Sequence, residues 1–277
     1  MTLLQQTKHT RTAQLSRTLA ILLAGACLWV APAAFANHPV FLEGETDFDG
    51  DGLLGVDEDV DNDTDQVFGT IAAALAAANR AANQNGHVIC VTSGRFNEQV
   101  NITAANGDVS LQAAEGVYCA VEAVRAGDPN SATRQGQPGI IIAAPANRRV
   151  TIRNFVVRNW TEGIQILGSS SVTIDNCRVE HNRDFNIHVA DSARLTLVAS
   201  HVNAAGFRQG ANIDNTPNPG TGIAFDGSSV GVVADTTVSG NFSAGVSNTT
   251  GRKQNVEFLR GVAFNNASDF IDVKVRR

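Results

Sequence analysis

A recurring apolar pattern of about 22–25 residues constrains the fold of this chain more than any other feature. VTIRNFVVRN at residue 150 reappears as VTIDNCRVEHN at residue 172. Three further copies follow at intervals of 23, 36 and 25 residues, and the long interval contains an insertion over 206–221. The matched apolar residues are Val150/Val172/Leu195, Ile152/Ile174/Leu197/Val233/Phe258, Phe155/Cys177 and Val157/Val179/Val202/Val238/Ala263.

Each copy is followed by a second pair of apolar residues, often preceded by an Asn. The Asn residues predict a ladder of turn side chains that hydrogen-bond between successive copies, and the alternative is a row of Asn that contacts a ligand. The apolar pairs are Ile164/Ile166, Ile187/Val189, Ile223/Phe225, then Val246 and Ile271/Val273, and the Asn residues are Asn159, Asn182, Asn241 and Asn266.

Three short alternating strands per copy cannot enclose a core alone, but stacked copies bury their alternate residues continuously. The segments lack the 3.6-residue periodicity of helical repeats. The sequence therefore predicts an all-β protein, a single-stranded right-handed parallel β-helix of about 22–25 residues per coil. One helix is predicted before it, over 70–83, with Thr70 as its cap and Ile71, Leu75, Ala78 and Ala82 on one apolar stripe.

The register of the repeat also predicts neighbours across coils. Arg153 falls beside Asp175 and Arg158 beside Glu180, as opposite charges on adjacent parallel strands. Cys177 aligns with the inward Phe155 and is therefore expected to be a buried thiol. The spacing of Cys90 and Cys119 permits a disulfide in an exported protein.

The amino terminus has the pattern of a secretory signal peptide. Residues 1–18 are basic, residues 19–30 are apolar, and Ala34-Phe35-Ala36 provides a small-x-small cleavage site before Asn37. Twelve apolar residues are too few to span a bilayer comfortably, and no later segment is apolar enough, so no membrane span is expected. The prediction is a secreted or periplasmic protein, with lipidation at Cys27 as the alternative.

The formal net charge of −6 conceals a local concentration of acid. Residues 43–65 carry eleven acids and no Lys or Arg, and the acidic balance of the whole chain disfavours a nucleic-acid partner. DFDGDGLLGVDE fits a calcium loop, since oxygen ligands alternate, a Gly stands at position 6 and a Glu at position 12. The predicted Ca²⁺ ligands are Asp47, Asp49, Asp51, Leu53 through its carbonyl, and Glu58, with Asp59, Asp61, Asp63 and Asp65 for a second ion.

A solvated acidic linker is the alternative interpretation of this segment. If the segment is a calcium loop, the predicted organisation is a signal peptide (1–36), an acidic calcium-binding segment (37–65) and a β-helix domain (66–277).

FGTIAAALAAA, then GHVICVTSGRFNEQVNIT and the repeats that follow, resemble the pectin-lyase-like right-handed β-helix family over about residues 66–275. The resemblance implies that the helix caps the amino-terminal end of the stack. It implies little about activity, because the family includes lyases, hydrolases, epimerases and proteins without known chemistry. The chain lacks the Asp-Pro-His-Asp of mannuronan epimerases and the Asn-Thr-Asp and Gly-His-Gly of polygalacturonases.

The remaining catalytic candidates form a loose polar group near two long loops, 122–138 and 206–221. An Arg or His base with a neutralising cation could abstract the proton beside a uronate carboxylate. The alternative for His188 is a surface histidine stacked on Gln165, its neighbour one coil away. The candidates are His181, Arg183, Asp184, His188, His201 and Arg208.

Two functions are consistent with these features. The first is an exported, calcium-binding β-helix that binds polysaccharide without a recognisable catalytic motif. The second is a polysaccharide lyase or uronate epimerase that acts on acidic glycans. The missing family motifs and the scarcity of aromatic residues, which make up 6% of the chain, favour the first function.

Overall fold

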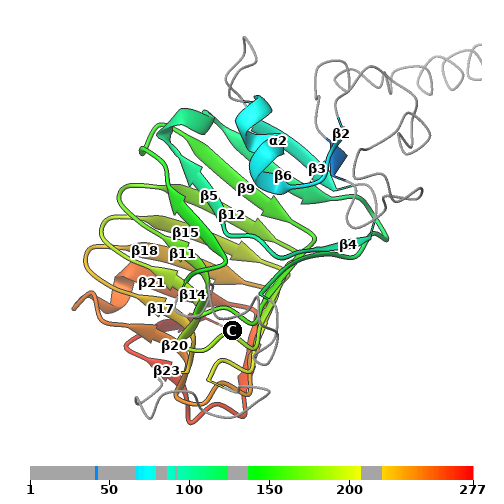
Figure 1. The fold of residues 1–277 in the computed structure, drawn as a ribbon. Coiled ribbons are helices and arrows are strands. Elements are labelled where there is room, and N and C mark those ends of the chain that lie inside the picture. The colour runs from blue at the N-terminus through cyan, green and yellow to red at the C-terminus, as the bar shows by residue number, and fades with distance from the viewer. Residues whose placement is uncertain are drawn as a thin grey trace, which may run out of the picture. The chain divides into compact units, whose positions relative to one another are not determined.

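The chain winds through three parallel β-sheets, as Figure 1 shows for a computed structural model. From β3 onward, neighbouring strands of each sheet come from successive coils and are separated by two other strands in the sequence. This arrangement confirms the predicted right-handed parallel β-helix. The structure describes residues 41–42, 67–78, 86–90, 93–123, 137–206 and 220–276.

Sheet 1 has ten described strands and runs the full length of the stack. Its inward residues alternate with exposed or half-buried ones, as in β12, where Val172 and Ile174 are buried. Its strands, in spatial order, are β2 (Val67–Phe68), β1 (Phe41–Leu42), β3 (Gly86–Cys90), β6 (Val109–Ala113), β9 (Arg149–Arg153), β12 (Ser171–Asp175), β15 (Arg194–Val198), β18 (Val230–Ala234), β21 (Val256–Leu259) and β24 (Lys274–Arg276).

Sheets 2 and 3 each have seven described strands and complete the coils. Sheet 2 contains β4 (Gly94–Phe96), β7 (Cys119–Glu122), β10 (Phe155–Arg158), β13 (Arg178–Glu180), β16 (His201–Asn203), β19 (Thr237–Ser239) and β22 (Val262–Phe264). Sheet 3 contains β5 (Val100–Thr103), β8 (Ile140–Ala143), β11 (Glu162–Ile166), β14 (Phe185–Val189), β17 (Thr221–Phe225), β20 (Ala244–Asn248) and β23 (Ser268–Ile271).

The pairing register matches the sequence repeat along most of the stack. Val150 pairs with Val172, which pairs with Leu195, and all three side chains are at most 2% exposed. The predicted interval of 36 residues across the insertion is also confirmed, because Leu197 pairs with Val233. The last coil differs from the prediction: Val246 pairs with Phe270. The predicted Ile271 is shifted by one residue and is 43% exposed.

An asparagine ladder runs inside the corner between sheets 2 and 3, as predicted. Oδ1 of Asn182 accepts from the backbone N–H of Trp160 at 3.0 Å, and Oδ1 of Asn266 accepts from the N–H of Asn241 at 3.0 Å. The prediction was wrong for Asn159, which is in register with His181, one residue before the ladder position. Both have positive φ, at 67° and 54°, and make the sharp bend of the corner.

The predicted helix lies at the amino-terminal end of the stack as α2 (Ile71–Ala78), beside β3 and β5 (Figure 1). Thr70 caps it, since its Oγ1 accepts from the N–H of Ala73 at 3.1 Å. Glu98 adds a second cap, because Oε1 accepts from the N–H of Ile71 at 2.6 Å and Oε2 from that of Ala72 at 3.0 Å. The predicted continuation over 79–83 lies outside the described residues. Two 3₁₀ turns complete the described helices, η2 (Ala104–Asn106) and η4 (Lys253–Asn255).

The disulfide that the sequence permits, the predicted buried thiol and the predicted ion pair on sheet 1 are also present. Cys90 and Cys119 form a disulfide with a Cα–Cα distance of 6.5 Å, which joins sheet 1 of the first coil to sheet 2 of the second. Cys177 is a free, buried thiol. Arg153 binds Asp175 at 2.6 Å on the outer face of sheet 1. No helix in the described part of the chain is long and apolar enough to cross a membrane.

Candidate functional site

Two long insertions leave the stack at the same corner, between sheets 2 and 3. The first separates β7 from β8 and the second separates β16 from β17. Hydrogen bonds between coils continue up to both ends of the second insertion. Before it, the N–H of Gly206 donates to the carbonyl of Asn182 at 2.9 Å. After it, the N–H of Thr221 donates to the carbonyl of Asp184 at 2.9 Å. Polar residues on either side of this corner are therefore the candidate site, since long loops on a rigid scaffold often carry binding residues.

A line of polar side chains crosses the outer face of sheet 3 diagonally, from Glu162 at the end of its strand next to this corner to Asp226 at the opposite end of a strand, where the chain turns toward sheet 1. His188 on β14 lies between two carboxylates from neighbouring coils, with Nδ1 at 3.1 Å from Oε2 of Glu162 and Nε2 at 2.9 Å from Oδ2 of Asp226. The hydroxyl of Thr249, one coil further, donates to the other oxygen of Asp226. The ring of Phe185 lies 4.7 Å from the imidazole, centroid to centroid. Four successive coils therefore contribute to one polar line.

The charge state of His188 follows from these contacts. Its burial opposes the charged form and lowers the pKa, but the hydrogen bonds and negative charges of Glu162 and Asp226 outweigh this effect, so the pKa is raised above its ordinary value. The imidazolium form also donates from both ring nitrogens, as two acceptor carboxylates require. The line therefore combines an imidazole whose protonated form is favoured with two carboxylates, of which Asp226 is the more exposed, at 43%.

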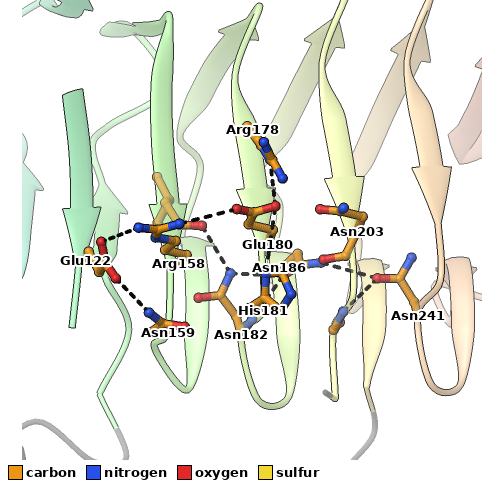
Figure 2. Close-up of polar contacts among 12 residues, drawn as sticks. Glu122, Arg158, Asn159, Arg178, Glu180, His181, Asn182, Asn186, Asn203 and Asn241 are labelled. Carbon is orange, nitrogen blue, oxygen red and sulfur yellow. Dashed lines mark hydrogen bonds and ion pairs between the residues drawn. The ribbon is translucent and has the colours of Figure 1, made fainter. Parts of the chain in front are cut away.

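A second charged cluster lies on the outer face of sheet 2 (Figure 2). Arg158 is in register with Glu122 on one side and Glu180 on the other. Its guanidinium lies 2.7 Å from Glu122 and 3.8 Å from Glu180, so the predicted pair with Glu180 is the longer of the two contacts. Arg178 binds Glu180 through Nε at 2.6 Å, and Asn159 donates to Glu122 at 2.9 Å.

The structure divides the predicted catalytic candidates among separate places. His188 lies on sheet 3, whereas His181 lies 3.7 Å from Glu180 on the sheet 2 side of the corner. Arg183 and Asp184 form an ion pair at 2.8 Å in the turn between them. His201 is exposed at the start of β16, and Arg208 lies outside the described residues.

Sequence reasoning missed Glu122, Glu162 and Asp226. Glu122 precedes the insertion that separates β7 from β8, so the repeat was not visible in that coil. Glu162 is the first residue of β11, and Asp226 directly follows β17, so neither lies within the regular alternation of a strand. His188 does pair with Gln165, as predicted, but its hydrogen bonds go to the two carboxylates.

The described part of the chain was also searched for residues that could hold a metal ion. Within the described ranges, no group of three or more His, Cys, Asp or Glu side chains is arranged to hold a metal ion. The predicted calcium ligands, from Asp47 to Asp65, lie outside the described residues. Calcium binding by that segment therefore stays a prediction.

Comparison with known proteins supports the fold. Residues 138–274, from the strand before the third coil to β24, match a family model described as a right handed beta helix region. This part of the chain is a right-handed β-helix region. Neither the curated proteins nor the solved structures contain a match to the chain. The resemblance to the pectin-lyase-like proteins therefore stays a prediction within this broader description.

Proposed function

We propose that this protein is an exported, calcium-binding β-helix that binds a polysaccharide along the outer face of sheet 3. The observation that carries the proposal is the polar line through Glu162, His188 and Asp226. It crosses three adjacent coils and begins, at Glu162, next to the corner from which both insertions leave.

A stacked fold suits a long, hydroxyl-rich ligand. Successive coils are ~4.8 Å apart, so a linear polysaccharide along the stack meets a new set of side chains at regular intervals. The carboxylates accept hydrogen bonds from sugar hydroxyls, and charge-assisted bonds of this kind are stronger than neutral ones. His188 holds the two carboxylates in place before any ligand arrives, which lowers the entropy lost on binding.

The binding test uses two histidines on different sheets. His188→Ala and His201→Ala remove the same side chain, but only His188 belongs to the polar line. A panel of neutral and acidic polysaccharides is screened by affinity electrophoresis or calorimetry with the wild type and both variants. We expect the His188 variant to lose affinity for whichever glycan the wild type binds and the His201 variant to keep it for a neutral glycan. Equal affinity of the wild type and the His188 variant for that glycan would contradict the proposed location.

Export and calcium binding each have their own support. The disulfide between Cys90 and Cys119 is typical of proteins that fold in an oxidising compartment. The alternating acids of residues 47–65 have calcium-loop spacing. The mature amino terminus, determined on the exported protein, tests cleavage after Ala36. Calcium titration of the wild type and of the double variant Asp47→Ala/Glu58→Ala tests the ion, and equal binding by the two would contradict it.

One observation favours an enzyme as the second candidate. An imidazolium with a raised pKa, held next to an exposed carboxylate, is an acid and base pair of the kind that hydrolases, lyases and epimerases use. The same glycan panel, analysed for new unsaturated ends, new reducing ends or changed uronate composition, tests this function. A folded, calcium-loaded protein that binds glycan without changing it would exclude this function for the glycans in the panel.

A further inference from the structure

In the charged cluster on sheet 2, the carboxylates are buried and two of the arginines are exposed to solvent. The side chains of Glu122 and Glu180 are 8% and 3% exposed. Those of Arg95 and Arg178, which contact them, are 62% and 57% exposed. Solvent therefore meets guanidinium groups, although each cation has a carboxylate beneath it.

Arg178 uses only a small part of its hydrogen-bonding capacity. Among the described residues its guanidinium binds Glu180 through Nε alone, at 2.6 Å, and Arg95 approaches Glu122 through Nε at 3.7 Å. A guanidinium has five N–H donors. The terminal nitrogens of both arginines are thus left for a planar anion, which they could bind in a bidentate manner.

Two other exposed arginines, Arg153 on sheet 1 and Arg260 at its corner with sheet 2, are engaged differently. Arg153 is 53% exposed, close to Arg178, but it gives both Nε and Nη2 to Asp175, whose side chain is 25% exposed. Arg260 likewise gives Nε and Nη2 to Asp235, which is 42% exposed. In those pairs a carboxylate that is partly or largely exposed already occupies the side of the guanidinium that an anion would need.

The neighbours of Arg178 along its own row add no competing acid. Arg178 is in register with His201 on the next coil, and the row continues to Thr237 and Val262 in one direction and to Val156 and Ala120 in the other. Two cation-forming side chains therefore stand on adjacent strands without an acid between them in this row. The cluster Glu122, Glu180, Arg95, Arg158 and Arg178 sums to 3 − 2 = +1 before any histidine is protonated.

We propose that Arg178 and His201, with Arg95 three coils away, form a second binding site for the carboxylate or sulfate groups of an acidic polysaccharide. Three coils correspond to ~14 Å, so the two arginines can contact separate anionic groups of one chain. The buried glutamates hold the arginines and reduce the entropy that the long side chains lose on binding. The disulfide between Cys90 and Cys119, which is typical of exported proteins, favours a polysaccharide over nucleic acid as the polyanion. This site lies on another sheet than His188 and does not depend on the function proposed for that residue.

The experiment compares matched arginines. Arg178→Gln and the control Arg153→Gln each remove one half-exposed, ion-paired guanidinium. Binding of the calcium-loaded full chain to polygalacturonate, dextran sulfate, uncharged dextran and single-stranded DNA is measured between low and physiological salt. We expect binding to the two acidic polysaccharides, weaker at higher salt, with roughly three- to tenfold lower affinity in the Arg178 variant and no comparable change in the control.

Several outcomes would overturn the proposal: no binding to either acidic polysaccharide, equal losses in the Arg178 and Arg153 variants, or tighter binding to DNA than to polysaccharide. Because Arg178→Gln leaves Glu180 with less compensation, Arg95→Gln and Arg178→Lys serve as second variants. The thermal midpoint of each variant shows whether it folds. The Lys variant is expected to retain part of the affinity, since it keeps the charge and loses only the bidentate geometry. Loss of neutral-glycan binding in His188→Ala would concern the other site, whereas unchanged affinity of Arg178→Gln for both acidic polysaccharides would overturn this one.

Discussion

The side-chain amide of Asn186 donates a hydrogen bond to Oδ1 of Asn241 at 3.2 Å, across a whole coil and 55 residues of sequence. The coil between them has Ala205 at the ladder position, where its neighbours have Asn182 and Asn241. Asn186 replaces the missing amide, because its Oδ1 accepts from Asn182 at 2.9 Å while its Nδ2 reaches Asn241 (Figure 2).

Glycine occupies the position of Asn186 in three other coils, as Gly163, Gly222 and Gly245. A Cβ at Gly245 would lie 2.9 Å from Nδ2 of Asn266, the ladder residue of the next coil. A Gly at this position of one coil thus makes room for the ladder Asn of the next coil. The combination is reversed once, where Asn186 stands at this position and the small residue Ala205 stands at the ladder position of the next coil.

The first prediction concerns this exchange. Asn186→Gly should lower the free energy of unfolding by about 1–3 kcal/mol, because the buried amides of Asn182 and Asn241 each lose one hydrogen-bond partner. Adding Ala205→Asn should recover most of that loss, since the introduced amide could bind Asn182 and Asn241 as Asn266 binds Asn241. Urea unfolding of both single variants and the double variant gives the coupling energy. Additive effects would show that the two positions do not share one space.

The second prediction concerns pH. The raised pKa of His188 means that its contribution to stability is complete below about pH 6.5, the ordinary histidine value, and is lost as pH rises through the folded-state pKa. His188→Gln should therefore lower the thermal midpoint more at pH 5.5 than at pH 9. Thermal unfolding of both proteins across this range measures the difference. A constant difference would mean that the imidazole contributes by packing alone.

The third prediction concerns cysteine chemistry. Burial raises the pKa of the Cys177 thiol to about 12, and its Sγ lies 3.3 Å from the carbonyl oxygen of Asp175. We expect no alkylation of this residue by iodoacetamide in the native protein at pH 7.5, and rapid alkylation in urea, as located by peptide mass spectrometry. Reduction of the Cys90–Cys119 disulfide should lower the free energy of unfolding by roughly 2–4 kcal/mol without exposing Cys177. Native alkylation of Cys177 would indicate local opening of the corner between sheets 1 and 2.

The fourth prediction concerns the cap at the amino-terminal end. Glu98→Ala removes both carboxylate bonds to the first turn of α2 and should lower the free energy of unfolding by about 1 kcal/mol. Glu98→Gln keeps one acceptor and should cost less. Urea unfolding at low and high salt separates the two contributions, since only the charge interaction with the helix is screened. If both variants match the wild type, Thr70 alone is sufficient as a cap.

The sequence predicted the stack because its register is repeated in the identity of buried residues. Val150, Val172 and Leu195 each have to be apolar, so an alignment of the chain with itself finds them. The same logic placed Asp175 beside Arg153. It failed by one residue at Asn159, because that Asn is favoured by the left-handed backbone of the bend and not by the ladder.

The candidate site was less predictable, because its partners come from residues that the repeat does not constrain. His188 was recognised as an outward residue of a strand. Glu162 and Asp226 lie at opposite ends of sheet 3 strands, where side-chain direction depends on the geometry of the adjoining corners. Glu122 was concealed by an insertion. Side-chain pairing at corners therefore required coordinates.

The glycine stem of the second insertion has an engineering consequence. Gly206 and Gly220 lie against each other, with a Cβ built on Gly220 only 3.2 Å from the Cα of Gly206. In the next coil, four residues from Gly240 to Ser243 connect the equivalent strands. The segment between the two glycines could therefore be exchanged for a foreign peptide, or removed and replaced by a short turn, while the coils keep their pairing. The stack would then serve as a display scaffold, with a new recognition loop grafted between Gly206 and Gly220.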